Sequence, residues 1–478
     1  MIALFFFIVQ IGFGYTLLSF FDPVRKFSLS LRLLAGPVIG LVASTILTLL
    51  FALVAGNLSA AITVVLGIML VTIILTYRSK AFPFNLRELF SGFLRWVRLP
   101  SFWTLILLAI IISLLAYQAL LPQPPFYDAI LIGWGDIGLH LGIIQRLATA
   151  DPFIIEHPAL AGHPLTYSFL GHMLSAIYLK LGASLLVAYH MPVIVFDILA
   201  VGLFASFLHL FVRKRWLAVI LTVLILFGGG LGWWWFGKDV AQGYKIGGTQ
   251  GAIEIVSHPP HEYTHLDNRT SGKPAGYDAP NNIVWIVPAL SFMVHQRSFP
   301  IGMALALLVL MGFLLYRPDR RAARFGLLAG TLQLAHNHTF IALAFIFFGF
   351  LIVEYKAWRC YIRFAIITIL IAIPFALYLA LPTIIHGSNT HFFKPWWGWM
   401  TCGHNMGWLT CDPTTQEGTD RSALWFWTKN FGMVFVGWAL ALLYLTVQWF
   451  RWRVVDVNTK LVAAGSLVLF AAPNLFLF

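Results

Sequence analysis

Two side chains that can act together on a substrate lie close in the sequence. Asp136 and His140 are four residues apart in Gly-Trp-Gly-Asp-Ile-Gly-Leu-His, and the amphipathic pattern over 137–148 predicts a helix there. On a helix this spacing places both side chains on one side, where a carboxylate can act as general base on an acceptor hydroxyl. The alternative is structural: Asp136 caps the helix and His140 faces water. The spacing alone leaves both interpretations open.

Further polar residues follow in short motifs. Arg297 lies in His-Gln-Arg-Ser directly before an apolar run. The Arg297 guanidinium can bind two phosphate oxygens of a substrate at once. Alternatively, Arg297 is an ordinary interfacial arginine whose side chain extends towards lipid headgroups. His336 and His338, at the tip of a predicted hairpin, can contact phosphate or simply face solvent. The candidate substrate-binding residues are Glu156, His163, Tyr167, Gln296, Arg297, His336 and His338.

The composition defines the class of protein that must position these residues. Of the 478 residues, 60% are hydrophobic and 10% are charged, whereas ordinary soluble domains have about 25% charged residues. A soluble enzyme is therefore excluded, and apolar runs of about twenty residues predict an all-α, polytopic membrane protein with about twelve transmembrane helices. The predicted spans are 2–21, 33–55, 58–76, 102–121, 184–211, 216–236, 298–316, 323–336, 339–355, 362–382, 423–449 and 461–478.

Loop charges predict how these helices are oriented in the cell membrane. No Lys or Arg precedes the first span, and Arg25 and Lys26 follow it, so the N-terminus is expected outside. Alternation then assigns most Lys and Arg to cytoplasmic connections. These connections are 22–32, 77–101, 212–215, 317–324, 356–363 and 450–460. The net charge of +13 thus reflects topology and attraction to anionic membrane lipid, and a nucleic-acid partner is not expected.

The long connections fall on the predicted outer side. The predicted segments are an N-terminal four-helix segment at 1–121, a first outer loop at 122–183, and the remaining helices at 184–478 with outer loops 237–297 and 383–422. An amphipathic stretch at Tyr167–Leu181 is expected to lie along the membrane interface. Asn282–Val294 is too short to span and contains Pro288, which predicts a re-entrant or interfacial segment. The sequence stops inside an apolar run, so we expect a longer natural chain.

Several other features allow two interpretations. His261-Glu-Tyr-Thr-His265 matches the HExxH zinc signature, but the preceding Pro259-Pro260 and the absence of an apolar helix face disfavour a metalloprotease. Asp197 lies inside a predicted span. An ionisable group there either faces a polar cavity, which suggests a function, or is buried and hydrogen-bonded in a structural role.

His172 and His190, near the start of the same span as Asp197, can line the same cavity. Cys402 and Cys411 can close a small outer loop. The tryptophans of that loop can stack on a sugar or form an interfacial belt. They are Trp396, Trp397, Trp399 and Trp408.

Short motifs spread over about 120–435 resemble an uncharacterised prokaryotic branch of the GT-C superfamily of membrane glycosyltransferases, which includes protein mannosyltransferases and aminoarabinose transferases. The motifs are Gly-Asp136-x-x-x-His140, Ala161-Gly-His-Pro-Leu-x-Tyr167, Gly228-Gly-Gly-Leu-Gly232, Tyr263-Thr264 before Asn282, His295-Gln-Arg297-Ser-Phe, Ala329-Gly-x-x-x-x-x-His336-x-His338, and Gly398-Trp399-Met400 before Phe426-Trp-x-x-Asn430. The resemblance implies a GT-C-like fold with large outer loops.

The resemblance also implies an activity: transfer of a sugar from a polyprenyl-phosphate carrier to a glycan, lipid or protein acceptor on the outer face. The catalytic carboxylate of the first outer loop falls on Asp136, with Asp128 as the second choice and His140 beside it. No metal ligands are assigned, because Asp128 and Asp136 do not form a tight acidic pair, although a divalent metal is not excluded. The alternatives are a transporter of lipid-linked glycans or small solutes, and the metalloprotease.

Overall fold

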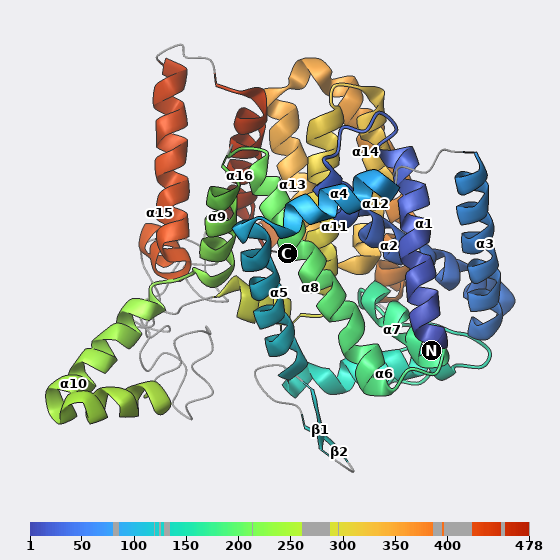
Figure 1. Cartoon of the computed structure of the whole chain (residues 1–478), viewed down its shortest axis with the longest axis horizontal. Coiled ribbons are helices and arrows are strands. Elements are labelled where there is room, and N and C mark those ends of the chain that lie inside the picture. The colour runs from blue at the N-terminus through green and yellow to red at the C-terminus, as the bar shows by residue number, and fades with distance from the viewer. Residues whose placement is uncertain are drawn as a thin grey trace. The chain divides into compact units, whose positions relative to one another are not determined.

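The computed structural model of the chain is built almost entirely of helices (Figure 1). It describes residues 1–79, 86–118, 120–123, 126–128, 134–212, 214–260, 287–294, 296–385, 394–395, 423–450 and 455–477. The α-helices are α1 (Ile2–Phe21), α2 (Leu29–Ala55), α3 (Leu58–Arg78), α4 (Leu86–Val97), α5 (Pro100–Gln118), α6 (Trp134–Thr149), α7 (Leu170–Lys180), α8 (Leu185–His209), α9 (Arg215–Phe227), α10 (Gly232–Ser257), α11 (Ser298–Tyr316), α12 (Phe325–Ala335), α13 (Asn337–Val353), α14 (Trp358–Ile385), α15 (Ala423–Phe450) and α16 (Val457–Leu475).

Short elements complete the secondary structure. A π-helix, η3 (Ala289–Val294), precedes α11, and the 3-10 helices η4 (Arg320–Arg324) and η5 (Tyr355–Ala357) precede α12 and α14. The strands form two antiparallel pairs: β1 (Leu121–Gln123) with β2 (Phe126–Asp128), and β3 (Lys394–Pro395) with β4 (Phe476–Leu477). These strands are only two or three residues long, so the chain is all-α in class.

Within the described residues, eight helices are long and apolar enough to cross a membrane. They cover Ile2–Phe21, Leu29–Ala55, Leu58–Arg78, Pro100–Gln118, Leu185–His209, Ser298–Tyr316, Tyr355–Ala380 and Phe431–Gln448. The multi-pass, all-α architecture agrees with the prediction, but the count of twelve spans is not confirmed: the described residues give eight, or nine if the bent pair α9 and α10 is one span. Length is one reason: the predicted runs 323–336 and 339–355 form helices of 11 and 17 residues, shorter than the roughly 20 residues that a bilayer core requires. The run at 216–236 is divided between α9 and α10.

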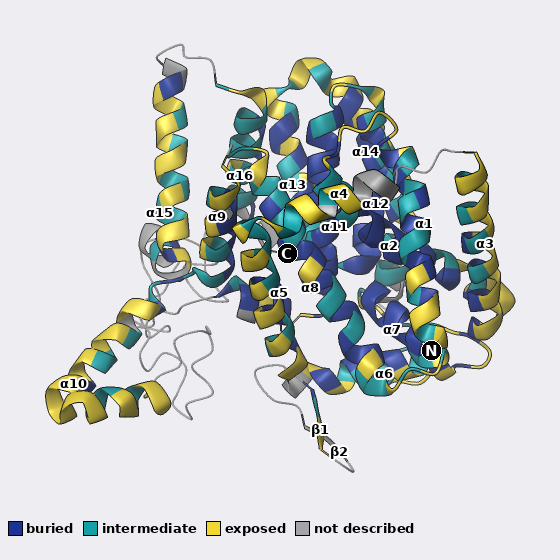
Figure 2. Ribbon diagram, viewed as in Figure 1, coloured by how far each residue is buried: buried dark blue, intermediate teal, exposed yellow. Residues whose placement is uncertain are grey.

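The contacts between residues divide the chain into two units. Unit 1 comprises Met1–Thr222, Phe292–Ala344 and Tyr355–Ser388, and unit 2 comprises Val223–Ser291, Phe345–Glu354 and Asn389–Phe478. In unit 1, helices α2, α7, α11 and α12 are mostly buried, whereas α3 and α5 expose many apolar side chains (Figure 2). Helices that are apolar on an exposed face suit a lipid environment.

Glycines allow α1 and α2 of unit 1 to approach closely. A Cβ added at Gly14 would lie 1.9 Å from the carbonyl oxygen of Gly36, and one added at Gly40 would lie 2.0 Å from the carbonyl oxygen of Gln10. Gly36 and Gly40 are four residues apart, the small-residue spacing that brings membrane helices together. The two helices therefore touch through their backbones, and a larger residue at Gly14 or Gly40 would push them apart.

Buried hydrogen bonds connect the α1–α2 pair to α7. The Gln10 Nε2 atom donates to Ser44 Oγ at 2.8 Å, and the Tyr178 hydroxyl donates to Gln10 Oε1 at 2.7 Å. Gln10 lies on α1, Ser44 on α2 and Tyr178 on α7. Since Gln10 uses both ends of its amide, this polar group is satisfied inside an apolar core.

At the other end of α1, Asp22 fixes the connection to α2 against α11. The Asp22 carboxylate accepts from Arg32 Nε at 3.1 Å, from the Tyr316 hydroxyl at 2.6 Å and from the backbone N–H of Lys26 at 2.7 Å. Its side chain is only 1% exposed. This buried carboxylate is therefore both paired with a cation and hydrogen-bonded.

Helices α6, α7, α8 and α11 of unit 1 position the candidate site. Helix α7 contacts α6, α8 and α11, and α8 contacts α11. Every residue from Leu170 to Tyr178 of α7 is buried. The polar side chains of α7 therefore face other helices inside the unit, and the prediction that Tyr167–Leu181 lies along the membrane interface stays a prediction.

Unit 2 contains α10, α15, α16 and the second half of α13. A Cβ at Gly349 of α13 would lie 2.7 Å from the carbonyl oxygen of Ala464 on α16, so these two helices are in close contact. Trp438 of α15 donates from Nε1 to Ser466 Oγ of α16 at 3.0 Å. The Phe470 ring lies 4.8 Å from that of Trp438, which adds aromatic packing to the same contact.

Candidate functional site

The candidate site contains a buried guanidinium, that of Arg297 at the start of α11. The residue is 3% exposed. Its Nη2 donates to Ser175 Oγ of α7 at 2.7 Å, and its Cζ lies 4.1 Å from the centre of the Tyr189 ring of α8. Its Nε and Nη1 atoms are buried with no hydrogen-bond partner among the residues that the structure describes. The interpretation of Arg297 as a surface residue reaching for headgroups is therefore wrong.

Arg297 is also uncompensated in charge. Burial lowers the pKa of Arg297 from its ordinary value, and among the described residues the groups that oppose this shift are Tyr189 and Tyr167. In the described part of the chain no carboxylate pairs with Arg297. An arginine pKa lies so far above neutrality that the group stays charged. Burying such a charge without a counter-ion is costly, and an anionic ligand would relieve this cost.

Next to the guanidinium, two histidines form a buried pair. His140 of α6 and His172 of α7 approach at 2.9 Å between Nδ1 of His140 and Nε2 of His172. Burial, together with the charges of His140 and Arg297, holds the pKa of His172 well below its ordinary value. His172 is therefore neutral at physiological pH.

The direction of the hydrogen bond between His172 and His140 follows from the one ring nitrogen of His172 that has no partner in the described residues. The Nδ1 atom of His172 is buried without a partner in the described residues. An unpaired buried N–H is rarer in proteins than an unpaired acceptor, which favours a proton on Nε2 of His172 donated to Nδ1 of His140. In this arrangement Nδ1 of His140 accepts the hydrogen bond.

Tyr167 and Asp136 lie at the exposed side of the histidine pair. The Tyr167 ring centre is 6.0 Å from that of His140 and 5.7 Å from that of His172. Burial raises the pKa of Tyr167, and the charge of Asp136 adds to this rise while that of Arg297 opposes it. The carboxylate of Asp136 and the guanidinium of Arg297 thus both act on the Tyr167 hydroxyl.

The two alternatives for Asp136 and His140 are now distinguished in part. Helix α6 begins at Trp134, so Asp136 lies inside its first turn and not at the cap position. Asp136 is exposed, whereas His140 is 5% exposed. The interpretation in which His140 faces water is wrong, because it packs between α6 and α7 against His172.

Glu156 and His163 belong to a loop between α6 and α7. Glu156 binds Arg146 of α6 and accepts from the backbone N–H of Gly162 at 2.7 Å. These two contacts lower the pKa of Glu156. His163 is exposed, and its carbonyl oxygen accepts from the His157 N–H at 2.8 Å. Glu156 thus holds this loop in shape, and the substrate-binding role predicted for both residues stays a prediction.

The residues near the start of α13 lie against α11. The Nδ1 atom of His336 is 2.7 Å from Thr339 Oγ1, and its ring centre is 5.6 Å from that of His338. A Cβ at Gly302 of α11 would lie 2.7 Å from the Cβ of His336, so this histidine is packed onto the helix that follows Arg297. His338 and Gln296 are exposed. The histidines are therefore neighbours of α11 without a direct hydrogen bond to the Arg297 group.

The remaining candidates are placed as follows. The backbone of Asp128 pairs with Leu121 in the β1–β2 pair, and its side chain lies outside the described residues. Also outside them are His261–His265, the first five residues of Asn282–Val294, Cys402, Cys411 and the tryptophans Trp396, Trp397, Trp399 and Trp408. The described residues contain no group of three or more His, Cys, Asp and Glu that could hold a metal.

Asp197 and His190 both lie on α8. Asp197 is fully buried, and neither of its carboxylate oxygens has a partner in the described residues. His190 approaches the carbonyl oxygen of Leu120 at 2.8 Å through Nε2, and its ring lies 4.7 Å from that of Tyr117. His190 and His172 therefore have different partners, although the sequence predicted a shared cavity.

Four predicted residues thus meet at one place: Asp136, His140, Tyr167 and Arg297. The analysis of residue spacing missed Ser175, which binds the guanidinium, and Tyr189, which stacks on it. Both are isolated polar residues in apolar stretches. This isolation is the one feature of the sequence that could have indicated a buried polar contact there. The resulting constellation offers an exposed carboxylate, a histidine pair and a buried cation, which suits a base and a cation acting together on one anionic substrate.

We found no match for this chain among protein-family models, curated proteins or solved structures.

Proposed function

We propose that the chain is an integral membrane glycosyltransferase of the GT-C kind, which moves a sugar from a polyprenyl-phosphate carrier to an acceptor on the outer face of the cell membrane. The observation that carries this proposal is the buried guanidinium of Arg297, whose Nε and Nη1 have no partner among the described residues. A phosphate oxyanion is the counter-ion that a guanidinium binds best.

The neighbours of Arg297 support a group transfer in preference to simple anion binding. Asp136 is exposed in the first turn of α6 and is close enough to raise the pKa of Tyr167. A carboxylate in this position can accept the proton of an acceptor hydroxyl. Ser175 and Tyr189 hold the guanidinium from two sides, which orients it before the substrate binds.

The proposed reaction has one bond exchange. The acceptor hydroxyl oxygen attacks the anomeric carbon of the donor sugar, and its proton passes to the carboxylate of Asp136. The bond between the anomeric carbon and the phosphate oxygen breaks, and the phosphate leaves with the electron pair. Arg297 stabilises the negative charge that develops on this leaving group, which is where an electrostatic contribution is largest.

A panel of radiolabelled polyprenyl-phosphate sugars tests the proposal on the purified full chain in lipid nanodiscs. We expect release of polyprenyl phosphate from at least one member, at a rate that Asp136→Asn lowers by about 10²–10⁴-fold. Asp151→Asn is the matched control, because this carboxylate is also exposed and follows the same helix. Equal rates for Asp136→Asn and the wild-type protein would refute the catalytic role of Asp136.

A second candidate function is a transporter of lipid-linked glycans or small solutes, and Asp197 favours it. An ionisable residue buried inside an apolar helix with no partner is typical of ion or proton pathways. Substrate flux into proteoliposomes that is abolished by Asp197→Asn and unaffected by Asp136→Asn would support the transporter. The reverse pattern, in carrier release, would support the transferase.

A further inference from the structure

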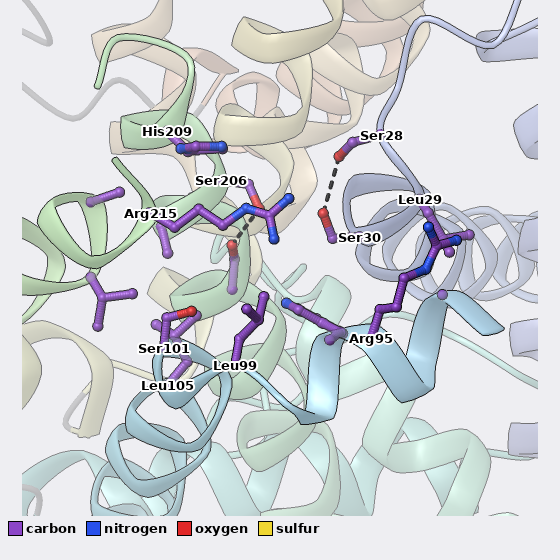
Figure 3. Close-up of a pocket in the computed structure, with 16 residues that line it drawn as sticks. Ser28, Leu29, Ser30, Arg95, Leu99, Ser101, Leu105, Ser206, His209 and Arg215 are labelled. Carbon is purple, nitrogen blue, oxygen red and sulfur yellow. Dashed lines mark hydrogen bonds between the residues drawn. The ribbon is translucent and has the colours of Figure 1, made fainter. Parts of the chain in front are cut away.

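A second polar region lies in unit 1, around a cavity of about 570 Å³ that is separate from the Arg297 group (Figure 3). Its lining comes from the start of α2, the end of α4, the start of α5, the end of α8 and the start of α9. The connections that meet here, 22–32, 77–101 and 212–215, are those whose Lys and Arg content predicts a cytoplasmic position.

The cavity is positively charged. Arg95 and Arg215 line it from opposite sides, with His209 beside Arg215, and Figure 3 shows the Arg215 side chain reaching towards the middle of the space. No Asp or Glu is among its lining residues. Among the described residues neither arginine forms a salt bridge with a carboxylate.

The acid nearest to Ser28 in sequence cannot neutralise this charge. Asp22 precedes the lining residue Ser28, but its carboxylate already binds Arg32, the Tyr316 hydroxyl and two backbone N–H groups. Both arginines are exposed, and Arg95 Nε also donates to the carbonyl oxygen of Ser91 at 3.3 Å. Two cationic residues thus line one open cavity whose lining has no acid, and their charge attracts an anion from outside the chain.

Helix geometry adds to the positive potential. The first residues of three helices line the cavity: Leu29 and Ser30 of α2, Ser101 of α5, and Arg215 of α9. The N–H groups of a first helical turn have no partner within the helix, and the helix dipole makes that end positive. The hydroxyls of Ser28, Ser30 and Ser101 lie in the same wall, with Ser28 and Ser30 hydrogen-bonded to each other, whereas the Ser206 hydroxyl already donates to the carbonyl oxygen of Gly202. Charged groups, helix ends and hydroxyls are thus all suited to phosphate oxygens.

The apolar part of the lining favours a lipid over a soluble phosphate. Leu29, Trp96, Leu99, Leu105 and Val219 line the same space. Trp96 and Leu99 belong to or follow α4, a strongly amphipathic helix of the kind that lies in a membrane interface. A phosphate-bearing headgroup attached to acyl chains would use both the cationic and the apolar parts of this wall.

We propose that this cavity binds the phosphate headgroup of an anionic phospholipid, held by Arg95 and Arg215. The site is independent of the proposed glycosyl transfer, because it shares no residue with the Arg297 group. Basic pockets between membrane helices on the cytoplasmic side are known to hold anionic lipid headgroups.

Native mass spectrometry of the full chain, released from nanodiscs of phosphatidylglycerol and phosphatidylcholine, tests this proposal. We expect one tightly retained phosphatidylglycerol in the wild-type protein. The double variant Arg95→Gln/Arg215→Gln is expected to lose it, with a decrease in apparent affinity of about 30-fold for the two charges together. The matched control is Arg98→Gln/Lys214→Gln, which removes the same charge from neighbouring residues outside the cavity lining.

Two further measurements complete the test. Ser206→Leu fills the cavity without changing its charge, so it is expected to displace the lipid while the thermal midpoint shows that the protein remains folded. Retention of the lipid by both cavity variants, or equal loss in the Arg98/Lys214 control, would overturn the proposal. Inorganic phosphate that binds the wild-type protein as tightly as the lipid, and displaces it, would assign the cavity to a soluble phosphate and overturn the lipid assignment.

Discussion

The substitution Arg297→Met tests whether the buried guanidinium is uncompensated. The variant loses a charge-assisted hydrogen bond to Ser175, worth about 1.5–3 kcal/mol, and the stacking on Tyr189, worth about 0.5–2 kcal/mol. It also avoids the desolvation of a buried charge, which costs several kcal/mol, and Met has a similar length. These contributions nearly cancel, so the midpoint of thermal unfolding is expected within about 1 °C of the wild-type value.

Arg32→Met is the control, because Arg32 is a largely enclosed arginine that pairs with the buried carboxylate of Asp22. Its Nε lies 3.1 Å from the carboxylate of Asp22, and the two side chains are 11% and 1% exposed. Removing one member of a buried ion pair leaves the other charge uncompensated, at a cost of about 3–5 kcal/mol. For a chain of this size this corresponds to a decrease in the midpoint of about 3–5 °C.

The assay is intrinsic tryptophan fluorescence during heating of the detergent-purified protein, with and without polyprenyl phosphate. At a ligand concentration of about 100 times the dissociation constant, binding stabilises the wild-type protein by about 2.7 kcal/mol, and Arg297→Met should abolish this gain. A fall in the midpoint of Arg297→Met as large as that of Arg32→Met would refute the reasoning, because it would show that Arg297 already has its counter-charge. An undiminished response of the variant to polyprenyl phosphate would refute its role in binding the carrier.

Two other predictions concern stability. Burial holds the pKa of His172 below its ordinary value, so only the unfolded chain binds a proton at this ring as the pH falls. The free energy of unfolding should therefore decrease as the pH drops below about 6.5. His172→Gln should reduce this pH dependence in unfolding midpoints measured between about pH 5 and 8. Gly14→Ala should destabilise the contact of α1 with α2 by about 1–3 kcal/mol, since its Cβ would lie 1.9 Å from the carbonyl oxygen of Gly36. Gly67→Ala in α3, where nothing lies within 4 Å of the added Cβ, should be neutral or slightly stabilising in the same denaturation series.

Each of these stability predictions has a clear contrary outcome. An unchanged pH slope in His172→Gln would mean that this ring is protonated in the folded protein, in conflict with its burial. Equal midpoints for Gly14→Ala and Gly67→Ala would mean that α1 and α2 are not held at the separation that the glycines permit.

Much of the helical framework could be predicted from sequence. The runs 2–21, 58–76 and 298–316 appear as α1, α3 and α11 with ends within two residues of those expected. Long apolar runs have few alternatives, because backbone groups inside a membrane must be hydrogen-bonded within the segment. The runs 323–336 and 339–355 also form helices with ends within two residues of those expected, but these helices, α12 and α13, are shorter than a bilayer-spanning helix.

The candidate site was predicted only in part. Asp136, His140, Tyr167 and Arg297 were selected by residue type and motif, and the structure brings all four into one region. Their environments were not predictable, however. His140 is buried by a helix that begins 30 residues later, and the partner of Arg297 is 122 positions away. Local spacing carries no information about contacts at such separations.

The sequence by itself determined that this protein is an all-α membrane protein, because composition and the length of apolar runs limit how a chain can satisfy its backbone in lipid. It also indicated which polar residues could perform chemistry. Only the tertiary structure decided that Arg297 is buried without a carboxylate partner in the described residues, that His140 and His172 form a pair, and that Arg95 and Arg215 face one cavity. The physical reason is that desolvation and charge compensation depend on which helices pack together, and this packing joins residues far apart in the chain.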